Sequence, residues 1–366
     1  MRILHVSNHV IFANGNVHAA VDLACAHAEA GHEVHYASQG GDYEKLLSEN
    51  GVVHHTICQS VKGPLRFAKS LSSLFSVVTK VNPDILHAHM MTGAVTGKII
   101  SLISGLPLVT TVHNAFDGHA VLMGLGDRVI GVSDAVSTNM IKRGVSSKRV
   151  VSVLNGTLNV ARRRSESNNR APLSHPSIMT ICGLHERKGI RHLLNAFDIV
   201  SKANGAVHLY ILGEGPDEKI YQEIAQNLAH GDRIHFLGLM RETRQYLASA
   251  DIFVLTSLQD PCPLVIPEAR EQGCAIVASD VDGIPEMLRV GNAGILVPPA
   301  NPEALANALL ALLSDPNALA SQRRASLSNI EYFDIKRVME QTNLVYLDLL
   351  VSKGRSSAET VSTTVA

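Results

Sequence analysis

The chain lacks a cysteine pairing motif and has almost no net charge, and each shortage excludes a class of protein. Its 366 residues include 32 basic and 33 acidic side chains, which leave a net charge of −1. Attraction of the whole protein to nucleic acid is therefore not indicated. The five cysteines contain no CxxC pair, so neither a disulfide framework nor a zinc knuckle is predicted. We expect buried thiols in a reducing cytoplasm.

The sequence also lacks a signal peptide and a membrane span. Residues 1–8 read as a short strand and a turn, without the apolar core and cleavage site of a signal peptide. The least polar stretch, 90–112, contains Lys98 and is broken by Gly105 and Pro107, which suits a buried helix, a turn and a strand. We predict a cytoplasmic protein, with at most peripheral contact at the inner face of the membrane.

Short apolar runs alternate with helical patterns along most of the chain. The first run, 3–6, precedes a helical pattern over 19–30 that ends at Gly31, and the next run covers 33–37. Such alternation predicts βαβ units and a mostly parallel, doubly wound sheet. The rhythm stops in a polar stretch after residue 158 and restarts at residue 177.

The interruption divides the predicted α/β protein into two doubly wound, Rossmann-like domains. The first domain is expected over 1–160, a linker over 161–176 and the second domain over 177–333. A helix over about 334–350 is expected to pack back toward the first domain, ahead of a disordered tail over 351–366. Doubly wound sheets bind ligands at the carboxyl ends of their strands, so we predict an active site in a cleft between facing domains.

Two carboxylates flank a tight turn in the second half. Asp260 and Glu268 are separated by seven residues, and Glu268 opens a helical pattern. A carboxylate in a first helical turn can accept hydrogen bonds from the vicinal hydroxyls of ribose or of a sugar. On spacing alone, the interpretation that Glu268 caps its helix and Asp260 starts a turn is equally good.

Two adjacent cations stand in the loop after the apolar run at 177–182. Arg187 and Lys188 precede Gly189 at the start of a helical pattern, where positive charge would offset a pyrophosphate. The alternative interpretation is a solvated pair of surface charges.

Two positions in the first half are further candidates. Gly15 stands in the first turn between strand and helix, where glycine permits close approach of a ligand to the backbone. His113 ends the apolar run at 108–112, at the ligand-binding edge of the predicted sheet. A lone histidine at such a place is more often structural than functional.

These segments resemble the retaining glycosyltransferases of family 4, whose acidic signature has two carboxylates with the spacing of Asp260 and Glu268. Further shared motifs follow in family order along roughly 1–350. They lie at residues 31–34, 83–89, 132–135, 155–156, 213–216, 236–238, 283–286 and 294–298. The resemblance implies the GT-B fold and transfer of a sugar from a UDP- or GDP-sugar to a glycan or lipid-linked acceptor. It also implies a role in polysaccharide, lipopolysaccharide or glycolipid biosynthesis.

The resemblance implies roles in donor binding for the acidic and basic residues. Glu268 would bind the ribose hydroxyls, and Asp260 would lie near the transferred sugar. Lys188 and Arg187 would stabilise the diphosphate as it leaves. The family has an arginine where this chain has Gly183, so Arg187 is taken to supply the missing charge.

The resemblance also implies contacts from backbone amides and from the first domain. The family often has glycine where this chain has Pro263, which has no N–H, so these amide contacts fall to Leu264 or Val265. Gly15 would lie against a phosphate or the substrate, and His113 would bind a sugar hydroxyl. The departing phosphate itself would receive the proton of the acceptor.

No cofactor and no metal are predicted. Asp280 and Asp282 superficially match the DxD metal signature of another glycosyltransferase fold, in a segment where the family has a glycine-rich turn. The eighteen histidines look scattered, and we expect His87 and His89 to point to opposite faces of their strand.

Contact with anionic lipid is predicted from basic residues. These are Lys142, Arg143, Lys148 and Arg149 in the first domain and residues 162–164 in the linker. Solvated surface charge is the alternative.

Three other functions fit parts of the pattern. A sugar-nucleotide 2-epimerase shares the fold and would bind the same donor without an acceptor. A dinucleotide-dependent oxidoreductase would need GxGxxG after the first strand, and residues 7–18 contain no such triplet. A non-catalytic sugar-binding protein would keep its role when Glu268 or Lys188 is replaced. The nucleotide, sugar, acceptor, linkage and oligomeric state stay open.

Overall fold

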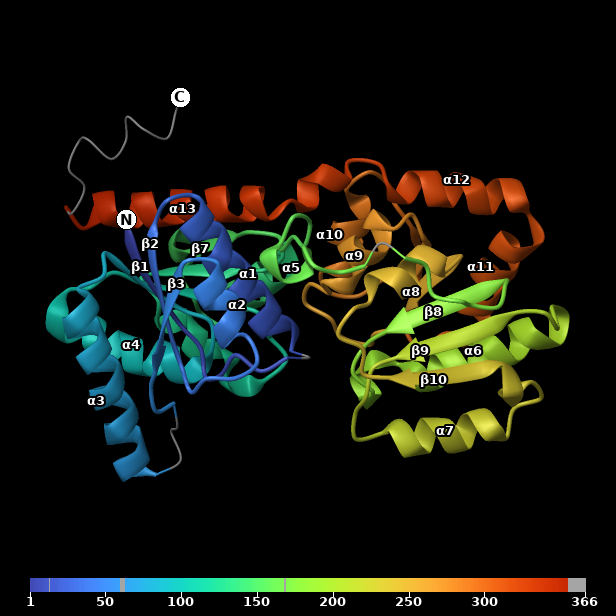
Figure 1. Cartoon of the computed structure of the whole chain (residues 1–366), viewed down its shortest axis with the longest axis horizontal. Helices are drawn as coiled ribbons and strands as arrows, with labels where there is room; N and C mark the ends of the chain where they lie inside the picture. Colours follow the sequence, from blue (N-terminus) through green and yellow to red (C-terminus); the bar gives the residue numbers. More distant parts are fainter. Residues whose placement is uncertain (13, 60–62, 168, 355–366) are drawn as a thin grey trace. The chain divides into compact units, whose positions relative to one another are not determined.

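The computed structural model describes residues 1–12, 14–59, 63–167 and 169–354 (Figure 1). They form two compact units. The first comprises Met1–Arg162 together with the segment that starts at Asp334, and the second comprises Arg163–Phe333.

The first unit is built on a seven-stranded parallel sheet with the order β3-β2-β1-β4-β5-β6-β7. Its strands are β1 (Arg2–Val6), β2 (Glu33–Ser38), β3 (Val52–Thr56), β4 (Ile85–Ala88), β5 (Leu108–Val112), β6 (Arg128–Gly131) and β7 (Val150–Ser152). Its α-helices are α1 (Gly15–Glu29), α2 (Glu44–Glu49), α3 (Pro64–Val81), α4 (Met91–Ser104), α5 (Asp134–Lys142) and α13 (Ile335–Ser352). The central strands are buried on both faces, as parallel strands covered by helices must be.

Local signals in the sequence set the ends of these helices. The side chain of Asn14 accepts a hydrogen bond from the amide of Asn16 at the start of α1. Ser133 caps α5 in the same way, through the amide of Val136. Gly105 ends α4 in the left-handed conformation, with φ of 68°.

Helix α13 belongs to the first unit although it follows the whole second unit in the chain. Its buried Tyr346 and Leu349 pack in one apolar cluster with Ile3 of β1 and Leu23 of α1. Figure 1 shows α13 in red beside this sheet. Residues 351–352 of the expected tail are the last turn of this helix, whereas residues 355–366 lie outside the described part of the chain.

The second unit has a six-stranded parallel sheet with the order β10-β9-β8-β11-β12-β13. Its strands are β8 (Ser177–Ile181), β9 (His208–Leu212), β10 (Ile234–Gly238), β11 (Ile252–Leu255), β12 (Ala275–Ser279) and β13 (Ile295–Val297). Its α-helices are α6 (Ile190–Ala203), α7 (Glu218–Gln226), α8 (Arg244–Ser249), α9 (Val265–Glu271), α10 (Ile284–Arg289), α11 (Pro302–Ser314) and α12 (Pro316–Ser326). Both sheets are doubly wound, which confirms the predicted α/β class of two Rossmann-like domains.

The predicted linker over 161–176 stays a prediction, although its described residues from Arg163 onward group with the second unit. Arg163 is 2% exposed, with Nε 3.0 Å from Glu166 Oε2 and Nη1 2.9 Å from Glu271 Oε2. Ser249 Oγ donates a hydrogen bond to the carbonyl of Ala171 at 2.7 Å. Polar composition suggested an exposed segment, and Arg164, Asn169 and Arg170 are exposed, but Arg163 and Glu166 form a buried ion pair.

Two smaller expectations concern thiols and membrane spans. The five cysteines form no disulfide in the described part of the chain, and Cys25, Cys262 and Cys274 are buried. Among the described residues, no helix has both the length and the apolar character needed to cross a bilayer.

Candidate functional site

In the second unit, the candidate residues follow the two strands at which the strand order reverses. The chain passes from β8 outward to β9 and β10, then returns to place β11 on the other side of β8. In doubly wound sheets this switch point, at the carboxyl ends of the strands, is where ligands bind. Arg187 and Lys188 follow β8, and Asp260 and Glu268 follow β11.

Hydrogen bonds join the loop after β8 to the loop after β11. The amide of Leu258 donates to the carbonyl of Arg187 at 2.7 Å, and Thr256 Oγ1 donates to the carbonyl of Lys188 at 3.1 Å. Gly189 has φ of 67°, and a Cβ there would lie 2.0 Å from the carbonyl oxygen of Thr256. A side chain at this position would therefore push the two loops apart.

Lys188 and Asp260 form an ion pair in this junction. Lys188 Nζ lies 2.5 Å from Asp260 Oδ2, and the two side chains are 13% and 7% exposed. Ser257 Oγ donates to the same carboxylate oxygen at 3.0 Å, and the amide of Asp260 donates to Asp282 Oδ2 at 2.7 Å. Ser257 thus holds the carboxylate of Asp260 and Asp282 holds its backbone, and the carboxylate fixes the position of the ammonium group.

The other predicted donor-site residues lie on either side of this pair. Arg187 is exposed, and its Nη1 donates to the carbonyl of Gln259 at 3.4 Å. Leu264 and Val265 stand at the beginning of α9, where amides have no intrahelical acceptor. Glu268 lies in the first turn of α9 and is 7% exposed. All of these residues belong to the second unit.

Gly15 and His113 belong to the first unit. Gly15 is the exposed first residue of α1, and a Cβ there would have no atom within 4 Å. Packing of the unit alone therefore does not require glycine at this position. His113 directly follows β5 and is 9% exposed.

His113 is the end of a chain of hydrogen-bonded imidazoles that the sequence reasoning missed. Its Nε2 lies 3.2 Å from Nδ1 of His89, and Nε2 of His89 lies 2.9 Å from Nδ1 of His5. Nε2 of His5 then lies 3.2 Å from Nδ1 of His27, on helix α1. We call His27, His5, His89 and His113 the histidine chain.

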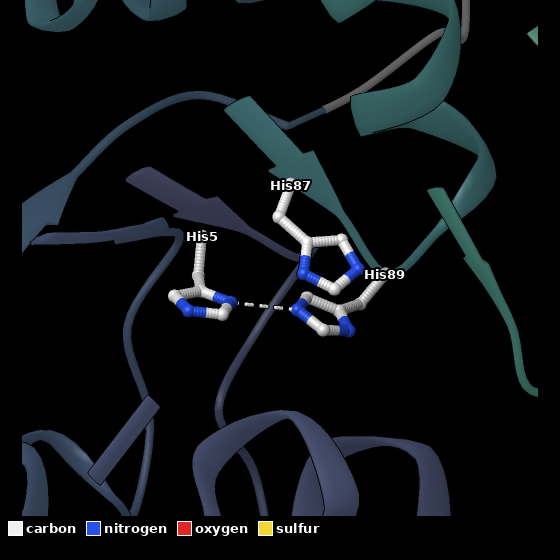
Figure 2. Close-up of side chains that lie close together, drawn as sticks. All are labelled: His5, His87 and His89. Carbon is white, nitrogen blue, oxygen red and sulfur yellow. Dashed lines mark hydrogen bonds between the residues drawn. The ribbon is translucent and has the colours of Figure 1, made fainter. Parts of the chain in front are cut away.

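The expectation for His87 and His89 is wrong. Residues two apart along a strand lie on the same face of the sheet, and the ring centroids of this pair are 4.2 Å apart. Figure 2 shows both rings turned toward His5. His87 bonds outside the histidine chain, with Nδ1 2.6 Å from the hydroxyl of Tyr346 and Nε2 2.7 Å from Oγ1 of Thr111.

Burial keeps these imidazoles neutral. It lowers the pKa of His5, His87 and His89 well below 6.5, the pKa of His27 to about 3 and the pKa of His113 to about 4. Neutral imidazoles are metal ligands, and each of His5, His87 and His89 has a ring nitrogen within 4.8 Å of one on the other two. All six of their ring nitrogens already have hydrogen-bond partners, which a metal ion would have to displace.

The basic residues expected to face lipid are partly engaged within the protein. Arg162 Nε lies 2.9 Å from Asp22 Oδ2, and Arg163 is buried, so both expectations in the predicted linker are wrong. Arg143 and Arg149 donate to backbone carbonyls of the first unit. Lys142, Lys148 and Arg164 are exposed.

Comparison with known families matches each unit separately. The family described as "Glycosyltransferase Family 4" matches residues 13–157, in the first unit. The family described as "Glycosyl transferases group 1" matches residues 175–315, in the second unit.

Individual proteins agree with the family matches. The lipopolysaccharide core biosynthesis glycosyltransferase LpsE of Rhizobium meliloti is 30% identical over 50% of this chain, and the match spans about half (52%) of that relative. The N-acetyl-alpha-D-glucosaminyl L-malate synthase of Bacillus anthracis is 24% identical over 88% of this chain and 91% of its own.

Solved structures share the fold. HepE of Anabaena in complex with UDP aligns with a TM-score of 0.80 and 20% identity, over 95% of this chain and 100% of that one. The lipopolysaccharide glycosyltransferase WaaG aligns with a TM-score of 0.71 and 14% identity. The two doubly wound units, the acidic and basic motifs at the strand ends of the second unit and these matches agree: the chain belongs to the family 4 glycosyltransferases and is an enzyme of the GT-B fold.

Proposed function

We propose that this glycosyltransferase moves a sugar, with retention of its anomeric configuration, from a UDP- or GDP-sugar to a glycan or lipid-linked acceptor. The product would enter cell-surface lipopolysaccharide or polysaccharide. HepE was solved with UDP, and LpsE takes part in lipopolysaccharide core synthesis, which supports both parts of the proposal. The observation that carries it is the ion pair of Lys188 and Asp260 at the switch point of the second sheet.

The basic residues would act on the leaving group. Departure of the nucleoside diphosphate builds negative charge on its phosphates, and a cation fixed in advance stabilises that charge without reorganising. Lys188 is such a cation, because Asp260 and the closed junction of two loops hold it. Arg187, in the same loop, would add charge where the family's arginine is replaced by Gly183.

The remaining donor contacts would come from the start of α9. Glu268 would accept hydrogen bonds from the ribose hydroxyls, and the amides of Leu264 and Val265 would donate to the sugar or the phosphates. In the first unit, Gly15 would allow close approach of substrate, and His113 would bind a sugar hydroxyl. The proton of the acceptor would pass to the departing phosphate.

We propose that neither a metal nor another cofactor takes part. Lys188 and Arg187 would offset the negative charge of the diphosphate, which a divalent cation offsets in metal-dependent transferases. Asp282, part of the DxD-like segment after β12, accepts a hydrogen bond from the amide of Asp260 in the loop after β11, which supports a structural role. Transfer activity should survive dialysis against EDTA, and loss that is restored by Mg²⁺ or Mn²⁺ would contradict this proposal.

The two alternative functions, a 2-epimerase and a sugar-binding protein, predict different products from a transferase. A 2-epimerase would convert the sugar nucleotide without an acceptor, and a sugar-binding protein would release no nucleotide at all. A transferase releases free nucleoside diphosphate in proportion to the acceptor supplied. Measuring that release with and without acceptor therefore separates the three.

The donor is identified by thermal stabilisation. A ligand that binds only the folded state raises the melting temperature by mass action. We expect one or a few UDP- or GDP-sugars to stabilise the wild type and to lose this effect in Glu268→Gln. If no nucleotide sugar stabilises the wild type, or Glu268→Gln responds equally, the proposed donor site is wrong.

A further inference from the structure

The histidine chain joins the core of the first unit to the candidate site residue His113. It begins at His27 in α1, continues through His5 in β1, and reaches His113 through His89 (Figure 2 shows the middle members). His5 and His27 have no exposed surface, and His89 is 3% exposed. Burying an imidazole costs free energy unless its ring nitrogens are hydrogen-bonded, and a buried apolar side chain does not have this cost.

The geometry of the histidine chain allows only two proton arrangements, and in each of them all four rings are the same tautomer. A neutral imidazole has one N–H donor and one bare nitrogen acceptor. Every link joins Nδ1 of one ring to Nε2 of the next. All three bonds can therefore form together only if all four rings carry their proton on Nδ1, or all four carry it on Nε2.

The proton arrangement of the histidine chain determines whether Nδ1 of His113 is a donor or an acceptor, because this nitrogen makes no bond within the histidine chain. If the chain is protonated on Nδ1, then Nδ1 of His113 donates to a ligand, and if it is protonated on Nε2, then Nδ1 of His113 accepts. The orientation of the His113 ring is fixed by the same bond to His89.

We propose that His27, His5 and His89 are positioning residues that fix the tautomer and the ring orientation of His113 through this chain of hydrogen bonds. The proposal rests on the proposed function in which His113 binds a sugar hydroxyl. A ligand at His113 selects one proton arrangement, and the change extends to His27. The three residues act on substrate only through His113.

His87 provides a matched control. It is as buried as His5, and its ring packs against His89 and His5, with centroids 4.2 Å and 5.3 Å away. Its own bonds go to Tyr346 and Thr111. His5→Phe and His87→Phe each remove one buried imidazole and leave two polar groups without their partner, but only His5→Phe cuts the histidine chain.

The first test uses the full-length protein with ¹⁵N-labelled histidine and is independent of catalysis. Nitrogen–nitrogen couplings across hydrogen bonds should link His27 to His5, His5 to His89 and His89 to His113, and all four rings should be protonated on the same nitrogen. His87→Phe should retain the coupling of His89 to His113 and its tautomer, and His5→Phe should separate this pair from His27. Rings of opposite tautomer within the chain would overturn the proposal, as would a stoichiometric transition metal bound by these histidines.

The second test measures transfer kinetics in single and double variants. His5→Phe should lower kcat about tenfold, the loss expected when one oriented hydrogen bond no longer holds the acting group. His87→Phe, matched in burial, should change kcat less than twofold on the same basis. In a His113→Phe background, His5→Phe should have no further effect, because it acts through His113.

The outcomes separate the two proposals. Additive losses for His5→Phe and His113→Phe would mean that His5 has a purely structural role and would overturn the positioning role. If the wild type shows the couplings but His113→Phe keeps full activity, then His113 has no role in the proposed function. The histidine chain would then have no effect on transfer. Couplings plus a non-additive loss would establish both.

Discussion

At the scale of single residues, the position of the Lys188 ammonium group depends on neighbours that are distant in sequence. Asp260 lies 2.5 Å from its ammonium group, and Ser257 holds Asp260 in turn. A half-buried cation without a counter-ion would adopt other rotamers or be solvated differently. The carboxylate is therefore as important to the position of the cation as the lysine itself.

Asp260→Asn tests this dependence. The amide keeps the shape of the side chain but removes the counter-charge of Lys188. We expect kcat to fall about tenfold or more, because misplacing one transition-state cation costs a large part of its stabilisation. Steady-state transfer kinetics measure the effect, with the exposed Asp232→Asn as the control. A kcat equal to that of the control would contradict the positioning of Lys188 by Asp260.

The buried histidines make stability depend on pH. An unfolded histidine titrates near 6.5, whereas burial lowers the pKa of His27 to about 3 and that of His113 to about 4. As the pH falls below 6.5 the unfolded state takes up protons that the folded state does not bind, so the free energy of unfolding decreases. Each such histidine contributes a slope of about 1.4 kcal/mol per pH unit between its two pKa values.

Denaturant unfolding between pH 7.5 and pH 5 measures that slope. His27→Phe should flatten it by the contribution of one histidine. Equal slopes in the wild type and His27→Phe would show that His27 is not held neutral in the folded protein.

The sequence predicted some candidate site residues and missed the contacts around them for a physical reason. Asp260, Glu268 and Lys188 stand in motifs whose spacing is local, so they could be found without coordinates. Ser257 and the histidine chain act through contacts between separate elements, which no spacing displays. The recurrence of histidine at positions 87 and 89 was a usable signal, because that spacing places both on one face of a strand.

At the scale of elements, the approach of two loops positions the candidate donor site. The turn after β8 and the turn after β11 touch where Gly189 faces the carbonyl of Thr256. Bonds from Thr256 and Leu258 close the junction. Both side chains of the ion pair are carried by these turns.

Gly189→Ala should therefore damage the site through the backbone. The new Cβ would overlap the carbonyl of Thr256, at a φ of 67° that costs about 1–3 kcal/mol for a residue other than glycine. We expect a lower melting temperature together with weaker binding of the nucleotide sugar. Gly15→Ala, in open space, should keep the melting temperature and raise only KM. Equal melting temperatures for Gly189→Ala and the wild type would contradict this account.

Element boundaries were predictable where apolar periodicity was clear. The pattern found β1, β2, β5 and α13 nearly in place, but it missed β3, because Val52–Thr56 contains two histidines and one exposed valine. Residues 161–176 were predicted as a linker because they are polar, although Arg163 among them is buried. Composition does not distinguish a charge in water from a charge in a buried ion pair.

At the scale of the whole molecule, each unit presents its candidate residues at the ends of its own strands. Both sheets have the same internal order, with the first strand in the middle and the fourth beside it. Alternating strand and helix patterns predict parallel βαβ units, which is why the fold class could be predicted, whereas the strand order comes from the structure. The donor sugar and the acceptor depend on a few contacts, and family resemblance does not determine them.

Peripheral contact with anionic lipid now rests on fewer residues than the sequence suggested. Lys142 and Lys148 are exposed, and a lysine near an anionic surface contributes about 1 kcal/mol. We propose weak, salt-sensitive binding of the full chain to vesicles containing phosphatidylglycerol. Sedimentation should show binding that the double variant Lys142→Ala and Lys148→Ala loses, with Lys336→Ala as an exposed control. No pelleting of the wild type at low salt would exclude this contact.

Binding of the donor tests the central claim most directly. Titration calorimetry with the stabilising UDP- or GDP-sugar should compare wild type, Glu268→Gln, Lys188→Met and the exposed control Lys219→Met. The account predicts affinity lowered about tenfold or more in each of the first two variants, since each loses a charged hydrogen bond to the ligand, and unchanged affinity in the control. Wild-type affinity in both Glu268→Gln and Lys188→Met would contradict it.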